Sequence, residues 1–251
     1  MMHFNTHPAR RGCRYGVERD MISHSRKFIF IHIPKTAGTS IEKCLTDVCV
    51  PVLAGANNTE SIYFKHTDIM GFKRMLGDYF LDHLSFTSVR NPWDWLISLY
   101  EFNRGMQRVY LKNTGHVAVG AEIPDELKDT PFDEWLIWWT ETFRATQSKL
   151  ICDPDGQLLV QRILAYESIR DDFSSLISQL NLPQRNLPWF HKRDKKGPRG
   201  HYFSPRLRGF VEKNFSEDIE RFGYAFDDPP NHVPETLRRL DASWRSRAKQ
   251  G

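Results

Sequence analysis

Residues 28–45 have the sequence FIFIHIPKTAGTSIEKCL, which decides the fold expected for this chain. The stretch begins with β-branched and aromatic residues, Phe28 to Ile31, a pattern that indicates a strand buried on both faces. This run breaks at Pro34, and apolar residues then return with helical spacing at Ile41, Cys44, Leu45 and Val48. A strand, a glycine-containing turn and a helix in this order predict a βα unit of an α/β protein.

The turn of this unit, Lys35 to Gly38, has the composition of a phosphate-binding loop. In such a layout, N–H groups without partners and the positive end of the helix dipole face the anion. Lys35 adds a mobile positive charge, and Thr39 and Ser40 place hydroxyls on the first helical turn. The spacing is not that of the nucleotide-triphosphate loop G-x-x-x-x-G-K-[ST], because the lysine comes before the glycine. Taken alone, the stretch also fits a strand-to-helix connection that binds no ligand.

A second stretch, LSFTSVRNPWDWLISLYEF at residues 84–102, repeats the strand-to-helix pattern. Ser85 to Val89 resembles another strand, Arg90 stands at its end, and Pro92 suits the first position of a helix. Ser98 follows two turns into that helix. Both Arg90 and Ser98 can therefore reach a ligand in the crevice where parallel α/β sheets bind nucleotides.

Together, IPKTAGTS at residues 33–40 and FTSVRNPWDWLISLY at residues 86–100 resemble the carbohydrate-type sulfotransferase family. The resemblance continues through residues 164–183 and 201–226, so that it covers roughly residues 27–226. In that family, the first motif binds the 5′-phosphosulfate of 3′-phosphoadenosine 5′-phosphosulfate (PAPS), and the second binds its 3′-phosphate through Arg and Ser. The donor-binding residues implied here are Lys35, Thr36, Ala37, Gly38, Thr39 and Ser40 for the first group, and Arg90 and Ser98 for the second.

The resemblance implies an α/β fold: a P-loop-NTPase-like three-layer sandwich with a central parallel sheet flanked by helices. The expected sulfotransferase domain spans residues 27–227, after an N-terminal extension (1–26) and before a polar C-terminal tail (228–251). The implied reaction moves a sulfuryl group in line from PAPS to an acceptor hydroxyl, on a carbohydrate or small molecule, and releases 3′,5′-ADP. Lys35 would neutralise the charge on the leaving phosphate, and no metal is implied.

The family commonly has a His general base between its two donor motifs, and His66 stands in that region, before a helix predicted at residues 68–76. An imidazole near its ordinary pKa can accept a hydroxyl proton at neutral pH. His32 has a rival claim, but its place in a buried strand favours a hydrogen-bonded core histidine. The outside candidates for the base are His83, His116 and His201.

Residues 191–202, HKRDKKGPRGHY, form a basic stretch. A charge run is usually a solvated face, but the corresponding loop of the family often covers the donor 3′-phosphate or the acceptor. The candidates for phosphate contact are Lys195, Lys196 and Arg199, and the last two are taken as donor-binding residues. Glu167, where the family also has an acidic residue, is expected to have a structural role.

Elsewhere, the pattern predicts helices at residues 132–143, 169–180 and 205–222, the last interrupted near residues 215–216. Strand-like runs flank a turn at residues 153–156, and residues 103–130 are expected to form a lid or a solvated loop. The aromatic residues of the helix at 132–143 favour a core position over a sugar platform.

Composition limits the classes of protein that remain. Among 251 residues, 40% are hydrophobic and the formal net charge is +4, which is far from the strongly basic balance of a nucleic-acid binder. No apolar run has the length of a membrane span or a signal peptide. The resemblance therefore favours a soluble bacterial-type member in the cytoplasm over a chain that lacks its anchor. Reduced thiols and no zinc site are expected from the spacing of Cys13, Cys44, Cys49 and Cys152.

Two alternatives remain open from the sequence. A kinase on the same fold would require Mg²⁺ and an acidic metal ligand at a strand end, for which the sequence has no convincing candidate. A non-catalytic nucleotide- or glycan-binding module would bind the donor without turnover, and His66 would then be dispensable.

Overall fold

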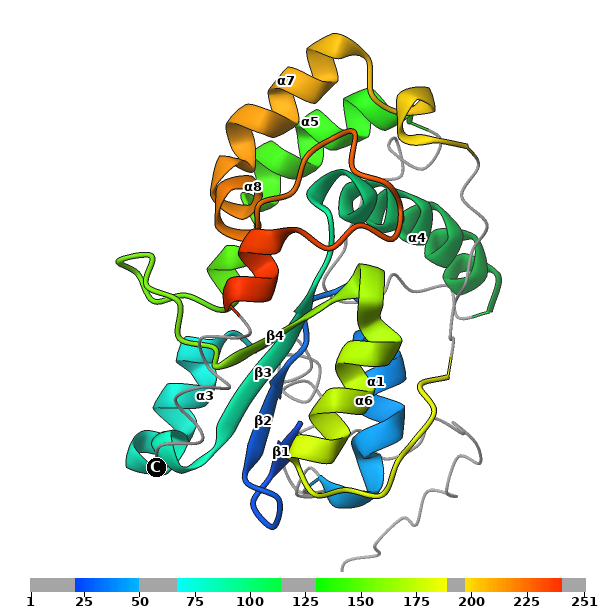
Figure 1. Cartoon of the computed structure of the whole chain (residues 1–251). Helices are drawn as coiled ribbons and strands as arrows, with labels where there is room; N and C mark the ends of the chain where they lie inside the picture. Colours follow the sequence, from blue (N-terminus) through cyan, green and yellow to red (C-terminus); the bar gives the residue numbers. More distant parts are fainter. Residues whose placement is uncertain (1–20, 50–66, 114–129, 189–196, 241–251) are drawn as a thin grey trace, which may run out of the picture.

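The computed structural model of the chain describes residues 21–49, 67–113, 130–188 and 197–240. These residues form a mixed α/β fold, in which a four-stranded sheet lies between helices (Figure 1). The strands are β1 (Ile22–Ser23), β2 (Phe28–Ile31), β3 (Leu84–Val89) and β4 (Arg162–Ala165), in that spatial order.

The sheet is mostly parallel, as expected. β2, β3 and β4 run in the same direction, whereas the short β1 pairs antiparallel with β2. Ile31 lies opposite Thr87, and Val89 lies opposite Ala165. The carboxyl ends of the three parallel strands therefore meet at one edge of the sheet.

Alternate residues of β2 pack on opposite faces of the sheet, as the period of a strand requires. Phe28 and Phe30 belong to one buried cluster with α1 (Gly38–Leu45) and α6 (Ile169–Gln179). Ile29 and Ile31 belong to the other, with residues of five helices: α3 (Ile69–Leu76), α4 (Pro92–Asn113), α5 (Phe132–Phe143), α7 (Pro205–Asn214) and α8 (Ser216–Phe222). The sheet is thus covered by helices on both faces.

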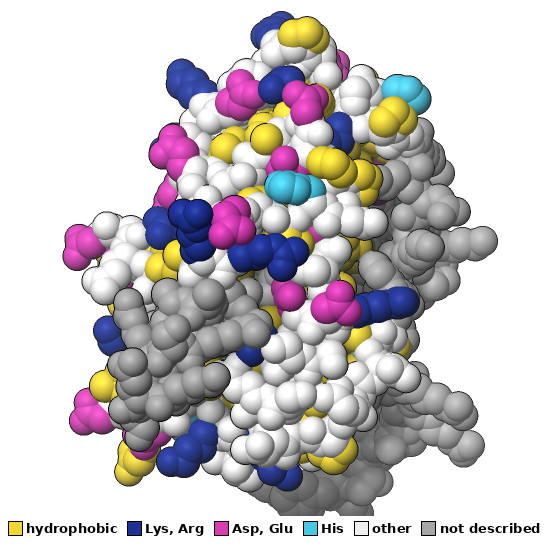
Figure 2. All heavy atoms as spheres, viewed as in Figure 1, with side chains coloured by type: hydrophobic (Ala, Val, Ile, Leu, Met, Phe, Trp, Pro, Cys, Tyr) yellow, Lys and Arg dark blue, Asp and Glu magenta, His cyan; other side chains and the backbone are white. Residues whose placement is uncertain are grey.

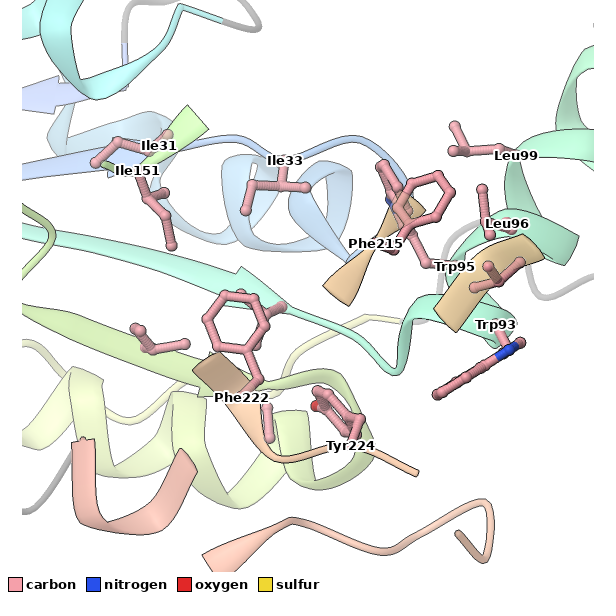
Figure 3. Close-up of a cluster of buried hydrophobic side chains, with 14 of the residues drawn as sticks. Ile31, Ile33, Trp93, Trp95, Leu96, Leu99, Ile151, Phe215, Phe222 and Tyr224 are labelled. Carbon is pink, nitrogen blue, oxygen red and sulfur yellow. The ribbon is translucent and has the colours of Figure 1, made fainter. Parts of the chain in front are cut away.

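Aromatic side chains dominate the second cluster, part of which is drawn in Figure 3. Trp95 of α4 meets Trp139 of α5 edge to face at a centroid distance of 5.7 Å, and Phe215 stacks on Trp139 at 6.4 Å. Each of these three side chains is at most 8% exposed. The expected core position is confirmed for Phe132, Trp135 and Trp139 of α5, whereas Trp138 is half-buried and Phe143 is exposed.

The helices predicted near the carboxyl end agree closely with the structure. Ser204 caps α7, since its hydroxyl accepts the N–H of Leu207 and Pro205 occupies the first turn. Phe215 separates α7 from α8, as expected. Helix α3 begins one residue later than predicted, because the Asp68 side chain caps it by accepting the Gly71 N–H.

Two segments differ from expectation. Helix α4 continues to Asn113, although a loop or lid was predicted from residue 103; once a helix is nucleated, each added residue gains a backbone hydrogen bond. The strand-like run at residues 149–152 instead begins with a 3₁₀ helix, η4 (Ser148–Leu150), followed by one bridge between Cys152 and Leu158. The buried carboxylate of Asp218 fixes this turn by accepting two backbone N–H groups at its start.

Packed residues extend beyond both expected domain limits. Met21 and Ile22 are buried, although they belong to the segment expected as an extension. Leu237, in the helical residues 235–240, is 2% exposed and joins the second core cluster. Within the described ranges, no helix combines the length and apolar character needed to cross a lipid bilayer.

Candidate functional site

The sheet has a switch point, named here the crevice position, where the connections after β2 and β3 pass to opposite faces. Helix α1, after β2, packs on the Phe30 face of the sheet, while α4, after β3, packs on the Ile31 face. In parallel α/β sheets, ligands bind outside the carboxyl ends of the strands at such a switch point. The loop of residues 32–37, named here the β2–α1 loop, and Arg90 flank this position.

The backbone of the β2–α1 loop is suited to hold an anion. Lys35 and Ala37 have φ angles of 66° and 76°, in the left-handed region that non-glycine residues avoid at a cost of about 1–2 kcal/mol each. Left-handed residues in alternation with others make a concave set of N–H groups, a known anion-binding arrangement. Ala37 is the N-cap of α1 and has no side-chain cap. The N–H groups of Ser40 and Ile41 donate to its carbonyl, so the N–H groups at the helix start that have no partner within the helix are those of Gly38 and Thr39.

Thr36 fastens the loop to the sheet. Its hydroxyl donates to the Ile33 carbonyl at 2.8 Å and lies 2.9 Å from the hydroxyl of Ser88, which donates to the Thr36 carbonyl at 2.7 Å. Thr36 is fully buried. Its hydroxyl therefore has its partners within the protein. The contact with PAPS that the sequence predicts for Thr36 would be made by its backbone N–H.

Gly38 is required by its neighbour His32. A Cβ atom at Gly38 would lie 2.0 Å from Cδ2 of His32, closer than real contacts allow. The imidazole cannot easily yield, because it is 4% exposed, stacks on Phe30, and its Nδ1 lies 2.5 Å from a carboxylate oxygen of Glu42. The prediction of a hydrogen-bonded core histidine is confirmed, and His32 and Glu42 together brace the start of α1.

Helix α4 holds the other side of the loop. The indole N–H of Trp95 donates to the Pro34 carbonyl at 2.7 Å. The ammonium of Lys35 lies 4.1 Å from the ring centroid of Phe102, a cation–π distance. Sequence reasoning missed Phe102, which no local pattern links to a lysine 67 positions earlier.

Arg90 is a buried cation at the end of β3. The residue is 7% exposed, and its guanidinium lies 4.0 Å from the ring centroid of Tyr166. Its Nη1 donates to the Lys35 carbonyl at a long 3.4 Å, and its Nε has no partner among the described residues. A buried charge is costly unless it is paired, so this guanidinium is suited to receive an anion.

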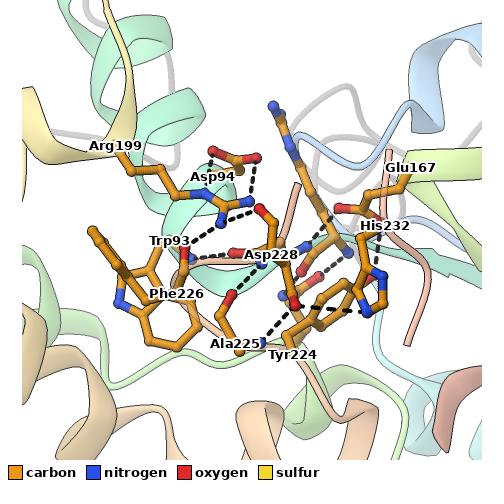
Figure 4. A network of polar contacts seen from close by, with 12 residues as sticks. Trp93, Asp94, Glu167, Arg199, Tyr224, Ala225, Phe226, Asp228 and His232 are labelled. Atoms are coloured by element: carbon orange, nitrogen blue, oxygen red, sulfur yellow. Dashed lines mark hydrogen bonds and ion pairs between the residues drawn. The ribbon is translucent and has the colours of Figure 1, made fainter. Parts of the chain in front are cut away.

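The nearby carboxylate of Glu167 is already used. One oxygen accepts the Asn91 N–H at 2.9 Å, and the other accepts the hydroxyl of Tyr224 at 2.7 Å (Figure 4). Burial raises the pKa of Glu167, and these two hydrogen bonds oppose that rise. Glu167 thus has the structural role expected for it, joining the start of α4 to the segment after α8.

Arg199, expected to contact the donor phosphate, binds groups of the protein itself in this structure. Its guanidinium binds both carboxylate oxygens of Asp94, with each N–O distance at 3.1 Å (Figure 4). Its remaining terminal nitrogen donates to the carbonyls of Phe226 and Asp228. These partners use four of the five N–H groups of the guanidinium, and the predicted contact of Arg199 with the donor phosphate stays a prediction.

The other hydroxyl candidates lie on the two helices that flank the crevice position. Thr39 is half-buried and Ser40 is buried on the first turn of α1, and Ser98 is half-buried on the second turn of α4. His66, Lys195, Lys196 and His116 lie outside the described residues.

Two histidines among the outside candidates are placed by the structure. His83 precedes β3, at the opposite end of the strand from Arg90, and its ring nitrogens contact the Tyr79 carbonyl and His24. His201 is exposed on the 3₁₀ helix η6 (Arg199–His201). His83 is therefore remote from the crevice position.

Charge on the face shown in Figure 2 is mixed: Lys and Arg side chains lie among Asp and Glu side chains. This distribution agrees with the small net charge of +4. On this face, local cations rather than a broad positive field are available to attract an anion. In the part of the chain that the structure describes, no three His, Cys, Asp or Glu side chains group to hold a metal ion.

Comparison with known proteins identifies the family. A model of the sulfotransferase family matches residues 19–225. Searches against curated proteins and against solved structures gave no match. The matched residues include the β2–α1 loop, Arg90 and Ser98, and they extend over all four strands of the sheet. This chain therefore belongs to the sulfotransferase family, whose members transfer sulfuryl groups.

Proposed function

We propose that this protein transfers a sulfuryl group from PAPS to a hydroxyl of a carbohydrate or small-molecule acceptor. The observation that carries the proposal is the buried guanidinium of Arg90, which lies beside the β2–α1 loop and whose Nε has no hydrogen-bond partner among the described residues. The Glu167 carboxylate is near enough to interact with this charge, but both of its oxygens already accept other hydrogen bonds. We also propose that the fold is P-loop-NTPase-like. The sulfotransferase domain in this proposal spans residues 27–227 together with the packed residues that flank them.

Each phosphate of the donor is assigned to one side of the crevice position. Backbone N–H groups from Thr36 to Thr39, together with the Thr39 and Ser40 hydroxyls, bind the 5′-phosphate. Arg90 and Ser98 bind the 3′-phosphate, which distinguishes PAPS from ATP. Charge-assisted hydrogen bonds contribute about 1.5–3 kcal/mol each, so loss of Arg90 weakens donor binding by roughly tenfold or more.

The chemical step divides between two further residues. PAPS supplies the sulfuryl group and leaves as 3′,5′-ADP. Lys35, a residue of the β2–α1 loop whose ammonium lies over the Phe102 ring, neutralises charge at the 5′-phosphate. His66 accepts the proton of the acceptor hydroxyl as its oxygen attacks. Lys196 is a further proposed phosphate contact. No metal is assigned, because Lys, Arg and backbone N–H groups meet the donor's charges.

Calorimetric titration with 3′,5′-ADP, ATP and 5′-ADP, each with and without Mg²⁺, tests the donor assignment. We expect micromolar, metal-independent binding of 3′,5′-ADP alone, on the order of −8 kcal/mol. Arg90→Ala should weaken it by roughly tenfold or more, and Arg206→Ala, which removes an exposed cation on α7, should leave it unchanged. Preference for ATP with Mg²⁺ would instead identify a kinase.

An acceptor screen then separates an enzyme from a binding module. With PAPS and a panel of sugars, lipid-linked glycans and small alcohols, the wild-type protein should form a sulfated product. His66→Ala should abolish turnover and keep the affinity for 3′,5′-ADP. Donor binding without any turnover across the panel would favour the non-catalytic module.

A further inference from the structure

The side chain of Gln147 holds the backbone of Arg90 from both sides. Its amide oxygen accepts the Arg90 N–H at 2.9 Å, and its amide nitrogen donates to the Arg90 carbonyl at 2.8 Å. Gln147 is fully buried. Because β3 ends at Val89, these two bonds continue the pairing of the strand by one residue, up to Arg90.

Gln147 is itself fixed by Asp218 on the first turn of α8. The carboxylate accepts the N–H of Gln147 at 2.8 Å and the N–H of Ser148 at 2.7 Å. Asp218 is fully buried, and burial raises its pKa. A chain of short hydrogen bonds therefore runs from α8 through Gln147 to the peptide groups of Arg90.

The direction of the Arg90 side chain depends on this chain of contacts. Among the described residues, the guanidinium has the long bond to the Lys35 carbonyl, the contact with the Tyr166 ring and an electrostatic interaction with Glu167. None of these contacts of the guanidinium is a hydrogen bond shorter than 3 Å, whereas the Arg90 backbone has two such bonds to Gln147. Fixing the peptide on each side of Cα fixes where the side chain starts, which is how a supporting shell orients a binding group.

We propose that Gln147 is a positioning residue of the donor site, which directs the Arg90 guanidinium toward the 3′-phosphate through the Arg90 backbone, with Asp218 holding Gln147 in place. This inference rests on the proposed function. It adds to the donor site a residue that touches no ligand and lies on a different segment, between α5 and η4.

Gln161 provides a matched control for a purely structural role. Its amide oxygen accepts the N–H of Ser85 at 3.0 Å, near the amino end of the same strand. Gln161→Met and Gln147→Met therefore each remove a glutamine amide from the backbone of β3, at opposite ends. Only the second change lies beside the residue assigned to the 3′-phosphate.

The experiment compares affinities for 3′,5′-ADP and for 5′-AMP, which lacks the 3′-phosphate, with urea unfolding measured in parallel. Gln147→Met should weaken 3′,5′-ADP binding by about tenfold, the equivalent of one charge-assisted hydrogen bond, and leave 5′-AMP binding unchanged. Gln161→Met should leave both affinities unchanged. Gln147→Asn, which keeps the amide on a side chain one methylene shorter, should fall between wild type and Gln147→Met, and it serves as the test if the methionine variant does not fold.

Three results would overturn the inference: unchanged 3′,5′-ADP affinity in both Gln147 variants, equal losses in Gln147→Met and Gln161→Met, or an equal loss of 5′-AMP affinity. A wild-type protein that binds no 3′,5′-ADP would refute the proposed function itself. These outcomes are distinct, since the first three require a wild-type protein that binds the nucleotide.

Discussion

Replacing Gly38 by Ala should destabilise the protein through a clash with His32. The added Cβ would lie 2.0 Å, 2.1 Å and 2.7 Å from three atoms of the imidazole ring. Overpacking of this kind costs about 1–3 kcal/mol, more than the roughly 1 kcal/mol that Ala gains over Gly in a helix. For a chain of this size, each 1 kcal/mol corresponds to a fall in melting temperature of about 2–4 °C.

Urea unfolding of a double-mutant cycle isolates the cause. His32→Ala removes the ring that the new Cβ would meet, so Gly38→Ala should cost much less in the His32→Ala background. The two changes should therefore be non-additive by about 0.5–3 kcal/mol. Gly209→Ala is the control, because a Cβ at that exposed position of α7 meets no atom within 4 Å. That variant should be as stable as the wild type or slightly more stable.

Two results would refute this reasoning. Gly38→Ala could prove as stable as Gly209→Ala, in which case the imidazole moves at no cost. Alternatively, the costs of Gly38→Ala and His32→Ala could simply add, in which case the destabilisation would have a source other than the contact between the two residues.

Three further predictions concern the residues around the crevice position. Thr36→Val removes the hydroxyl that donates to the buried Ile33 carbonyl and should lower the free energy of unfolding by about 1–3 kcal/mol in urea. Asp94→Asn breaks a buried ion pair with Arg199 and should cost about 3–5 kcal/mol; a loss below about 1 kcal/mol would mark the pair as a surface-like contact. Burial raises the pKa of Glu167, so the folded protein binds the carboxyl proton more tightly than the unfolded chain does. The stability that Glu167 contributes therefore falls as the pH rises above 4.5, the ordinary pKa of this side chain. Unfolding measured from about pH 4 to about pH 7 should therefore show the wild type losing stability relative to Glu167→Gln, and the opposite slope would contradict the raised pKa.

The elements with strong local patterns were predictable from the sequence. Strand β2 and helix α5 have the predicted limits, because burial on both faces and helical spacing leave continuous and periodic apolar runs. The two-residue β1 is too short to have a period, and it was missed. The extension of α4 beyond residue 103 was missed because its sequence has little apolar periodicity.

The candidate site was predictable where motifs lie next to strand ends, at the β2–α1 loop and Arg90. Contacts between distant side chains were not, since no spacing in the chain links Gln147 to Arg90 or Arg199 to Asp94. The basic stretch around Arg199 shows the difference: its charge suggested a phosphate ligand, but the fold brings a buried carboxylate to that guanidinium. Local chemistry indicates what a residue can bind, and only the tertiary structure shows what it meets.

The most direct test of the donor site is the distance between the Arg90 guanidinium and the 3′-phosphate in a crystal structure with 3′,5′-ADP. We predict N–O distances of about 2.7–2.9 Å, with the 5′-phosphate on the N–H groups at the start of α1. A 3′-phosphate bound away from Arg90, with the guanidinium still against Tyr166 and no anion beside it, would contradict the assignment.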